Sequence, residues 1–297
     1  MSKTSDMIRA HNIGAVGSNQ GEIVIPENVE CKKDLIYGKD QKWNVFDIYY
    51  EKSNDKKHPT LISIHGGGWV SNTKESYEAY CLDMAARGFN VINFTFRLAP
   101  EDKHPAMIED VNSMVCHLCE NADEYGLDMK HVFMVGDSAG GHMLAMYSAI
   151  CTNREYASTF DFKVPEDFVP TAIALNCGVY EIKTIMYSES KEPNAMKDIL
   201  YDYLGEDCSD EVITMNNPIE HVTSAFPPTY LMTGNADVFQ DQFEEMEKVL
   251  SENGVEHLFR NYGDENTRCP HVFHLNVGSE IANECNDNEV AFFMSKI

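Results

Sequence analysis

Ser138 has a sequence context suited to nucleophilic chemistry, because it lies within Gly136-Asp-Ser-Ala-Gly140. This G-x-S-x-G motif follows an apolar run, residues 131–135, and precedes a helix-forming run, residues 141–152. A strand, a sharp turn and a helix in this order place the serine at the apex of the turn, beside the N–H groups of the helix N-terminus. Glycines at both ends of the motif are consistent with such a turn, since it leaves little room for side chains. We expect Ser138 to be a nucleophile; the alternative is a glycine-rich turn without a chemical role.

A second glycine-rich segment, His65-Gly-Gly-Gly-Trp69, directly follows an apolar run. Three successive glycines after a strand leave backbone N–H groups unshielded, so that they can point at a ligand. A phosphate-binding loop is disfavoured because no G-K-[ST] sequence follows, which leaves a flexible loop as the other alternative. We expect the N–H groups of Gly67 and Gly68, together with that of Ala139, to bind an oxyanion.

A serine hydroxyl is a weak nucleophile at neutral pH and needs a base, and an acid that orients the base. When the serine occupies a G-x-S-x-G turn, the acid and then the base follow it along the chain, each after a strand. Asp237 and Asp241 are the candidates for the acid, and His271 and His274 are the candidates for the base. Asp241 lies about one helical turn, roughly 6 Å, beyond Asp237, so we expect Asp237 to reach the base. His274 would face the opposite side of an extended segment, which favours His271.

Other polar residues near these motifs are expected to have structural rather than catalytic roles. We expect His65 to hydrogen-bond to the backbone and to hold the shape of the glycine loop. His142 is interpreted as a packed residue of the helix after Ser138. Three charged residues are expected to hold loops near the sheet edge rather than to contact substrate (Arg97, Glu101, Asp110).

Two further segments, Phe96-Arg-Leu-Ala-Pro-Glu101 and His104-Pro-Ala-Met-Ile-Glu-Asp110, complete a family pattern with the glycine motifs. Together these motifs resemble the hormone-sensitive-lipase-like (bacterial family IV) esterases, which have the α/β-hydrolase fold. The resemblance runs from about residue 43 to the C-terminus, is most specific between residues 65 and 141, and does not include the first forty residues. It implies a Ser138-His271-Asp237 triad, with the histidine in the family's H-x-F setting. The chain departs from the family's D-P-L sequence at the acid, where Asp237-Val-Phe lacks the proline.

Strand-like and helix-like runs alternate along the chain, which predicts a mostly parallel sheet with helices on both faces. The run at 43–50 alternates in polarity, so we expect a strand near a sheet edge. Glycines after three of the helical runs are typical stop signals. The expected strands are 30–37, 43–50, 60–64, 90–96, 131–135, 171–176, 229–233 and 255–261, and the expected helices are 74–87, 105–125, 141–152, 239–253 and 289–296.

The length of the chain predicts a single α/β domain over residues 1–297 with a small helical cap. Residues 180–222 contain ten acidic and three basic side chains and are too long for a plain connection between strands. We interpret them as an inserted cap, or lid, over the site; a solvated surface excursion is the alternative. Residues 1–29 look irregular or weakly helical, since three glycines interrupt any pattern (Gly14, Gly17, Gly21). Whether this N-terminal segment is part of the cap is left open.

The formal net charge of -25 argues against nucleic acid and anionic membranes as partners. The nine cysteines have no regular spacing, and the C-x-x-C at Cys116–Cys119 has no second pair, so we expect no metal or redox role for it. No signal-peptide pattern and no apolar run of about 18 residues occur in the sequence, which favours a cytoplasmic protein. A homodimer is left open.

The expected chemistry is acyl transfer to water, which needs no metal ion and no organic cofactor. We expect Trp69 and the cap to form the walls of the acyl pocket, which favours short acyl groups such as acetyl to hexanoyl. The first hypothesis is therefore a carboxylesterase that acts on a small-molecule ester. The alternatives are a carbohydrate deacetylase or an arylformamidase with the same machinery, and a small-molecule receptor that has lost turnover.

Overall fold

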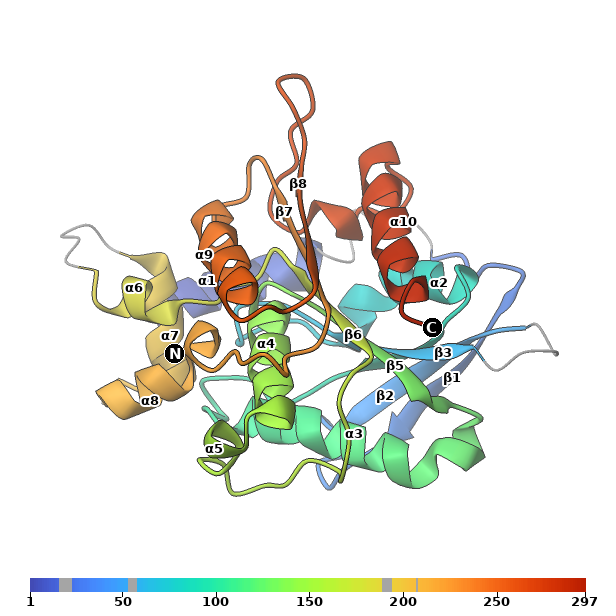
Figure 1. Ribbon diagram of the computed structural model, residues 1–297, viewed down its shortest axis with the longest axis horizontal. Coiled ribbons are helices and arrows are strands. Elements are labelled where there is room, and N and C mark those ends of the chain that lie inside the picture. The colour runs from blue at the N-terminus through green and yellow to red at the C-terminus, as the bar shows by residue number, and fades with distance from the viewer. Residues whose placement is uncertain (16–22, 53–57, 189–193, 207) are drawn as a thin grey trace.

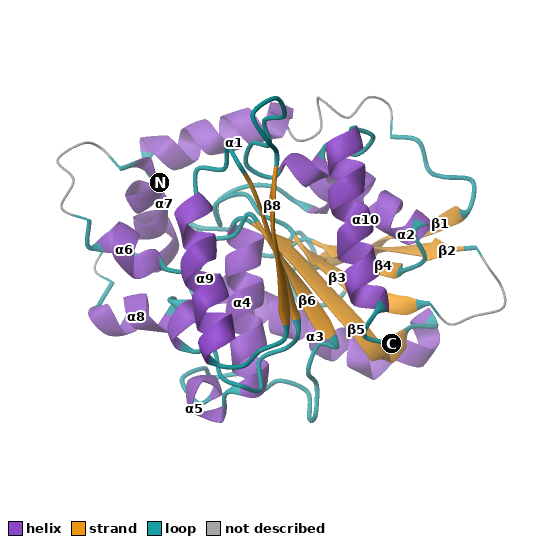
Figure 2. Ribbon diagram, turned by 45° about the horizontal axis from the view of Figure 1, so that its top comes forward, coloured by secondary structure: helices purple, strands orange, loops and turns teal. Residues whose placement is uncertain are grey.

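The described part of the chain forms one eight-stranded sheet in the order β1-β2-β4-β3-β5-β6-β7-β8 (Figure 1 and Figure 2). The computed structural model describes residues 1–15, 23–52, 58–188, 194–206 and 208–297. The strands are β1 (Val29–Ile36), β2 (Val45–Glu51), β3 (Pro59–Ile64), β4 (Asn90–Phe94), β5 (Asp128–Asp137), β6 (Ala172–Asn176), β7 (Thr229–Gly234) and β8 (His257–Tyr262).

All strands except β1 and β2 pair in parallel, and β2 pairs antiparallel with both β1 and β4. The central strands β3, β4, β6 and β7 are buried along their whole length. Continuous burial is typical of parallel strands that are covered on both faces. The predicted α/β-hydrolase architecture is confirmed. The strand predicted near an edge is β2, which lies second from the edge, next to the partly exposed β1.

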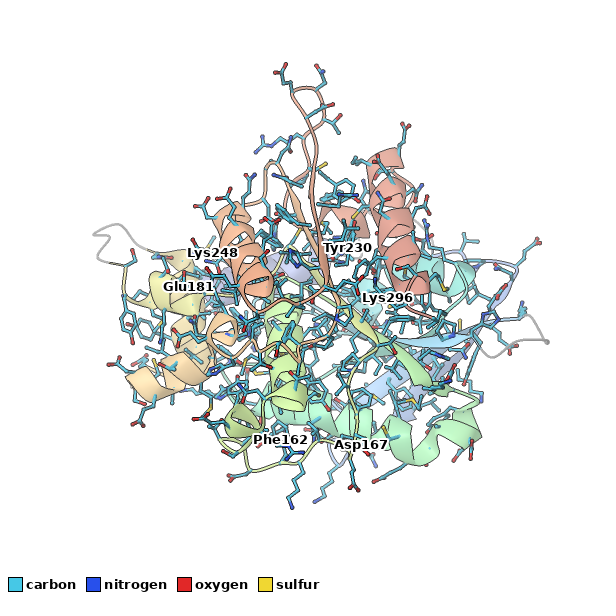
Figure 3. The ribbon with its side chains drawn as sticks, in the orientation of Figure 1. Phe162, Asp167, Glu181, Tyr230, Lys248 and Lys296 are labelled. Carbon is cyan, nitrogen blue, oxygen red and sulfur yellow. The ribbon has the colours of Figure 1, made fainter. Side chains whose placement is uncertain are left out.

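Helices cover both faces of the sheet (Figure 2). Alternate residues of a strand point to opposite faces, and Ile62 therefore belongs to one core cluster while Leu61 belongs to the other. Side chains fill the space between the sheet and the helices, and Tyr230 of β7 lies in this interior (Figure 3). One face packs against α3 (Ala106–Tyr125), α4 (Ala139–Thr152) and α9 (Gln240–Glu252), and the other packs against α2 (Glu78–Ala86) and α10 (Glu280–Met294).

Two helices differ in extent from the sequence prediction. The predicted helix 74–87 is a 3-10 turn, η1 (Lys74–Tyr77), followed by α2. The helix predicted at 289–296 begins nine residues earlier, at Glu280, because the Ser279 side chain accepts a hydrogen bond from the N–H of Ala282 and caps the helix. Among the residues that the structure describes, no helix is both long and apolar enough to cross a membrane.

Residues 180–222 form a group of short helices on one side of the sheet, beside α4 and α9 (Figure 1). This insertion contains α6 (Ile182–Met186), α7 (Ala195–Leu204), α8 (Asp210–Met215) and η2 (Pro218–Glu220), whereas residues 189–193 and 207 lie outside the described part. Its apolar side chains, among them Leu200 and Tyr203, are buried in the same core cluster as α3 and α4. The predicted helical insertion is therefore present as a packed element.

The N-terminal segment is more regular than predicted. Residues Lys3–Ala15 form a helix, α1, that runs through Gly14 and packs against α7 (Figure 2). The N–H of Ser2 donates to Asp202 at 2.7 Å, and the hydroxyl of Thr4 donates to Asp198 at 2.9 Å. These contacts with α7 outweigh the low helix propensity of one glycine. Of the two predicted alternatives, irregular or weakly helical, the helical one holds for residues 3–15, and Gly17 and Gly21 lie outside the described residues.

Candidate active site

Ser138 lies in the predicted sharp turn between β5 and α4. Its backbone φ of 53° and ψ of -123° are strained for a residue with a side chain, and its N–H donates to the carbonyl of Asn176 at 3.0 Å. A Cβ at Gly136 would lie 2.5 Å from the carbonyl oxygen of Gly140. A Cβ at Gly140 would lie 2.1 Å from the carbonyl oxygen of Ile64. Only glycine fits at both positions, so the motif places the elbow directly against the end of β3.

Ser138, His271 and Asp237 form a continuous hydrogen-bonded chain. His271 Nε2 lies 3.0 Å from Ser138 Oγ, and His271 Nδ1 lies 3.0 Å from Asp237 Oδ1. Because the carboxylate can only accept, Nδ1 carries the proton and Nε2 is left to accept from the serine hydroxyl. The chain segments after β7 and β8 are joined by a parallel bridge between Ala236 and Pro270, which brings the acid and the imidazole together. The structure therefore assembles the three residues that the sequence analysis selected.

Asp237 is held as a charged acceptor. Its side chain is fully buried, and it also accepts hydrogen bonds from the N–H of Phe239 at 2.9 Å and the hydroxyl of Thr233 at 3.3 Å. Burial opposes the charged form, but the hydrogen bond and the charge of His271 outweigh it and hold the pKa of Asp237 below its usual value. Asp241, the other candidate acid, is exposed on α9.

His274 lies in the core rather than at the site. It is buried against the ring of Tyr80, and its carbonyl accepts from the Asn286 amide at 3.3 Å. Burial lowers the pKa of His274 to about 3, so its ring is neutral at pH 7. The His271 side chain, by contrast, is 28% exposed. The segment between the two histidines is not extended, as the sequence prediction had assumed, but turns at Val272, whose φ is 53°, into a 3-10 turn, η3 (Phe273–Leu275).

The glycine loop after β3 lies against the elbow of Ser138. Gly67 and Gly68 have φ values of 122° and 61°, which favour glycine. Neither N–H group has a hydrogen-bond acceptor within the described part of the chain, and the same holds for Ala139. Three unpaired N–H groups near a nucleophile are suited to an oxyanion. Their assignment as an oxyanion hole stays a prediction.

Tyr77 joins the glycine loop to the elbow. Its phenol oxygen accepts from the N–H of Gly66 at 2.8 Å and donates to Asp137 Oδ2 at 2.8 Å. Asp137 is fully buried, and burial raises its pKa to about 7 in spite of the hydrogen bond from Tyr77. Neither residue was predicted from the sequence. Asp137 is the variable position within G-x-S-x-G, and Tyr77 carries no motif that could have revealed it.

A second buried carboxyl group lies behind the elbow. Glu289 of α10 accepts hydrogen bonds from the Tyr80 hydroxyl at 2.7 Å and the Asn176 amide at 2.6 Å. The carbonyl of Asn176 is the acceptor for the N–H of Ser138. Glu289 therefore holds the strand end on which the elbow rests. This residue was also missed, because its partners lie more than one hundred residues away in the sequence.

Trp69 follows the glycine loop and packs against side chains of α4 and α7. The indole is 1% exposed, stacks on Tyr203 with ring centroids 4.9 Å apart and donates to His142 Nδ1 at 3.3 Å. His142 Nε2 lies 2.8 Å from the carbonyl of Asn216, to which it donates. Burial lowers the pKa of His142 to about 4, which keeps it in this neutral form. The prediction of a packed His142 is confirmed, whereas a contact between Trp69 and the acyl chain stays a prediction.

His65 and Arg97 have the structural roles that were predicted for them. His65 Nδ1 lies 2.8 Å from the carbonyl of Gly66, and its ring stacks on Phe96. The guanidinium of Arg97 donates to both carboxylate oxygens of Asp110. Glu101 differs in detail, because it pairs with Arg9 of α1 and thereby ties the N-terminal helix to the loop after β4.

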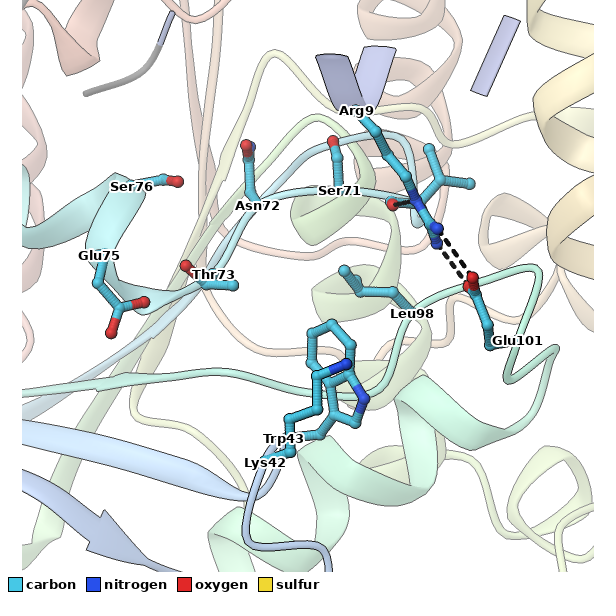
Figure 4. Close-up of a pocket in the computed structure, with 11 residues that line it drawn as sticks. Arg9, Lys42, Trp43, Ser71, Asn72, Thr73, Glu75, Ser76, Leu98 and Glu101 are labelled. Atoms are coloured by element: carbon cyan, nitrogen blue, oxygen red, sulfur yellow. Dashed lines mark hydrogen bonds and ion pairs between the residues drawn. The ribbon is translucent and has the colours of Figure 1, made fainter. Parts of the chain in front are cut away.

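A pocket of about 500 Å³ is lined in part by the segment that directly follows the glycine loop and Trp69 (Figure 4). Ser71 lines this pocket, and its hydroxyl donates to the carbonyl of Gly67 in the glycine loop at 2.8 Å. Of the described residues, neither Ser138 nor His271 lines this pocket. Its walls come from α1, the loop before β2, the segment after Trp69 and the segment after β4 (Arg9, Lys42, Trp43, Val70, Ser71, Asn72, Thr73, Glu75, Ser76, Leu98, Glu101).

The sequence of the chain matches the model of one protein family, BD-FAE, over residues 46–250. This span is more than half of the chain and contains both glycine motifs, Ser138 and Asp237. The chain belongs to the BD-FAE family. The resemblance to hormone-sensitive-lipase-like esterases of the α/β-hydrolase fold is confirmed.

Several named relatives of this BD-FAE chain are esterases. It is 27% identical to an esterase from Gibberella moniliformis over 63% of this chain and 59% of the relative. It is 26% identical to esterase LipC from Mycobacterium tuberculosis over 69% of this chain and 51% of the relative. The matches thus span only about half to three fifths of these relatives' lengths. Among solved structures, esterase B from Lactobacillus rhamnosis superposes with a TM-score of 0.86 at 24% identity, over 97% of this chain and 92% of that one. This last likeness shows the fold.

Proposed function

We propose that the protein is a serine carboxylesterase that hydrolyses short-chain acyl esters through an acyl-enzyme. The observation that carries the proposal is the Ser138-His271-Asp237 chain, with both hydrogen bonds at 3.0 Å. The exposed edge of His271 leaves the reacting atoms accessible, while Asp237 is sealed in the interior. The esterases among the relatives support the same reaction class.

In the first step, Ser138 Oγ attacks the ester carbonyl carbon while His271 Nε2 takes the hydroxyl proton. The carbonyl oxygen becomes an oxyanion, for which the N–H groups of Gly67, Gly68 and Ala139 are the proposed donors. His271 then gives the proton to the leaving alkoxide, and the alcohol departs. A water molecule, deprotonated by the same nitrogen, hydrolyses the acyl-enzyme and returns Ser138 to its starting state.

The role of Asp237 is to hold the imidazole with its proton on Nδ1 and to stabilise the imidazolium that forms. A buried carboxylate with a lowered pKa suits this role, because it remains charged while the imidazole changes protonation. The Phe239 ring packs edge-on against His271 with centroids 5.2 Å apart and supports its orientation.

The preference for short acyl groups rests on the cap. The indole of Trp69 is closed off by Tyr203, so the cap is packed down beside the glycine loop. A packed cap leaves limited room for a long acyl chain. One solved structure of esterase B, a protein of the same fold, carries a C4-C4 SN3 tributyrin phosphonate inhibitor.

The proposal is tested with p-nitrophenyl esters of increasing acyl length, assayed beside an acetylated sugar and N-formylkynurenine. We expect kcat/KM to be highest at or below four to six acyl carbons, and to lie within the range that is typical of enzymes in general, roughly 10⁴–10⁸ M⁻¹s⁻¹. A strong preference for the acetylated sugar or for N-formylkynurenine would favour the deacetylase or the arylformamidase. Binding of these compounds without any turnover would favour the receptor.

A further inference from the structure

A buried thiol lies beside the acid and the base of the proposed triad. The sulfur of Cys177, a carboxylate oxygen of Asp237 and a ring nitrogen of His271 all lie within 4.8 Å of one another. Cys177 is fully buried and the Asp237 side chain is too, whereas the His271 side chain is 28% exposed. The cluster is thus closed on the core side and borders solvent at His271.

The three side chains come from the ends of three neighbouring strands, which fixes their spacing. Cys177 directly follows β6, and Asp237 and His271 lie in the segments after β7 and β8. The N–H of Cys177 donates to the carbonyl of Met232 at 2.8 Å, and its φ of 49° places it in the left-handed region. Because the backbone is held at this point, the thiol is directed at the acid by the fold rather than by a flexible loop.

Thiolate sulfur, imidazole nitrogen and carboxylate oxygen are together the ligand types that proteins use for zinc. With metal–ligand distances of about 2.0–2.3 Å, the ligand atoms around a tetrahedral Zn²⁺ lie roughly 3.3–3.8 Å apart. The present spacing of at most 4.8 Å can reach this with small side-chain rotations.

We propose that Cys177, Asp237 and His271 form an inhibitory Zn²⁺ site that inactivates the enzyme by capturing the acid and the base. The proposal rests on the function proposed above, since inhibition follows from the loss of the triad. On binding, Zn²⁺ takes the sulfur of Cys177, whose proton leaves to the buffer. It also takes one carboxylate oxygen of Asp237 and Nδ1 of His271, and the proton on Nδ1 moves to Nε2.

Two consequences of this binding stop the reaction. With the proton on Nε2, His271 cannot accept the proton of Ser138, and with its carboxylate on the metal, Asp237 cannot stabilise an imidazolium. The metal lies behind the imidazole, on the side away from the ester. Inhibition should therefore lower kcat and leave KM almost unchanged. A metal bound in the substrate pocket would instead raise KM.

The test is a titration of the full-length enzyme with Zn²⁺ alone, with kcat and KM measured at each concentration. In Cys177→Ala, and in Cys177→Ser, the half-inhibitory Zn²⁺ concentration should rise by at least about tenfold, each relative to the variant's own metal-free activity. Cys116→Ala is the matched control, because Cys116 is a partly buried thiol remote from the site. It should keep the wild-type half-inhibitory concentration. An unchanged value in both Cys177 variants, or a rise in KM at constant kcat, would overturn the proposal.

A second measurement separates this site from the proposed function. Co²⁺ in place of Zn²⁺ should give a thiolate-to-metal charge-transfer band in the wild type and in Ser138→Ala, and no such band in Cys177→Ala. Because this readout needs no turnover, it would persist even if the protein were not an esterase. Absence of the band in the wild type, or its persistence in Cys177→Ala, would show that the cluster does not bind the metal through the thiol.

Discussion

Tyr77 donates a hydrogen bond of 2.8 Å to Asp137, the residue that directly precedes the proposed nucleophile. The same phenol oxygen accepts from the N–H of Gly66, at the start of the glycine loop. A Cβ on Gly66 would lie 2.8 Å from both the carbonyl and the carboxylate of Asp137, so the loop and the elbow are in direct contact here. One phenol therefore sets the position of the proposed oxyanion donors relative to the serine.

Tyr77→Phe should lower kcat by about tenfold with little change in KM, because the oxyanion loop loses its fixed position while ground-state binding is unaffected. The variant also leaves the buried N–H of Gly66 without a partner, which should cost about 1–3 kcal/mol of stability. Tyr230→Phe is the control, since this buried phenol contacts Tyr262 and not the loop. It should destabilise the fold without lowering kcat. Equal kcat values for the two variants would show that Tyr77 does not position the oxyanion loop for catalysis.

The acid is tested by comparing Asp237→Asn with Asp241→Asn. The first change should lower kcat by up to roughly 10⁴, because an amide favours the wrong imidazole tautomer. The second should lower it by less than about tenfold, since Asp241 is exposed and the acid position is filled by Asp237. Steady-state kinetics at saturating substrate give the ranking. The reverse order would transfer the role to Asp241.

Glu289→Gln should change how stability depends on pH. Burial raises the pKa of Glu289 to about 7, whereas the ordinary value is 4.5. Between these two values the folded protein keeps a proton that the unfolded chain has lost, so this group makes the wild type less stable as pH rises, by roughly 3 kcal/mol at most. The variant lacks this loss, and its Tm relative to wild type should be higher at pH 8 than at pH 5. Glu284→Gln, an exposed change on the same helix, should show no such trend.

Arg9→Ala should release α1 from the body of the protein. The guanidinium donates to the carbonyls of Val70 and Ala99 at 2.6 and 2.5 Å and pairs with Glu101. Its loss leaves these groups unpaired, and amide hydrogen exchange in α1 should accelerate, with a loss of about 1–3 kcal/mol in local protection. If α1 is part of the cap, KM should rise as well. Lys3→Ala, an exposed change on the same helix, is the control and should alter neither.

The elements that carry chemistry were predictable because their signals are local. Ser138 was found from a strand, a turn and a helix that are consecutive in the chain, and glycine at Gly140 is required by the approach of Ile64. The order of acid and base after Ser138 then limited the choice to a few residues. Asp237 was preferred to Asp241 because it lies closer along the chain to the end of the strand, and therefore to the base. In the structure, Asp237 Oδ1 lies 3.0 Å from His271 Nδ1.

The elements that were missed depend on contacts between distant parts of the chain. Tyr77 and Asp137 are 60 residues apart, and Tyr80 and Glu289 are 209 apart, so no spacing pattern connects them. α1 contains glycine and has a weak apolar stripe, and its contacts with α7 could not be read from its own sequence. The stacking of Trp69 on Tyr203 likewise joins residues far apart in the sequence, so it could not be predicted from the neighbours of Trp69 in the chain.

The most direct test of the central claim is to replace the proposed nucleophile and to label it. A fluorophosphonate probe should modify the wild type at Ser138 and at no other serine, as read by mass spectrometry of the digested protein. Ser138→Ala should keep the wild-type circular dichroism spectrum and Tm, lose the label, and lose ester turnover by a factor on the order of 10³ to 10⁶. A folded Ser138→Ala protein that still hydrolyses the ester at the wild-type rate would contradict the proposed mechanism.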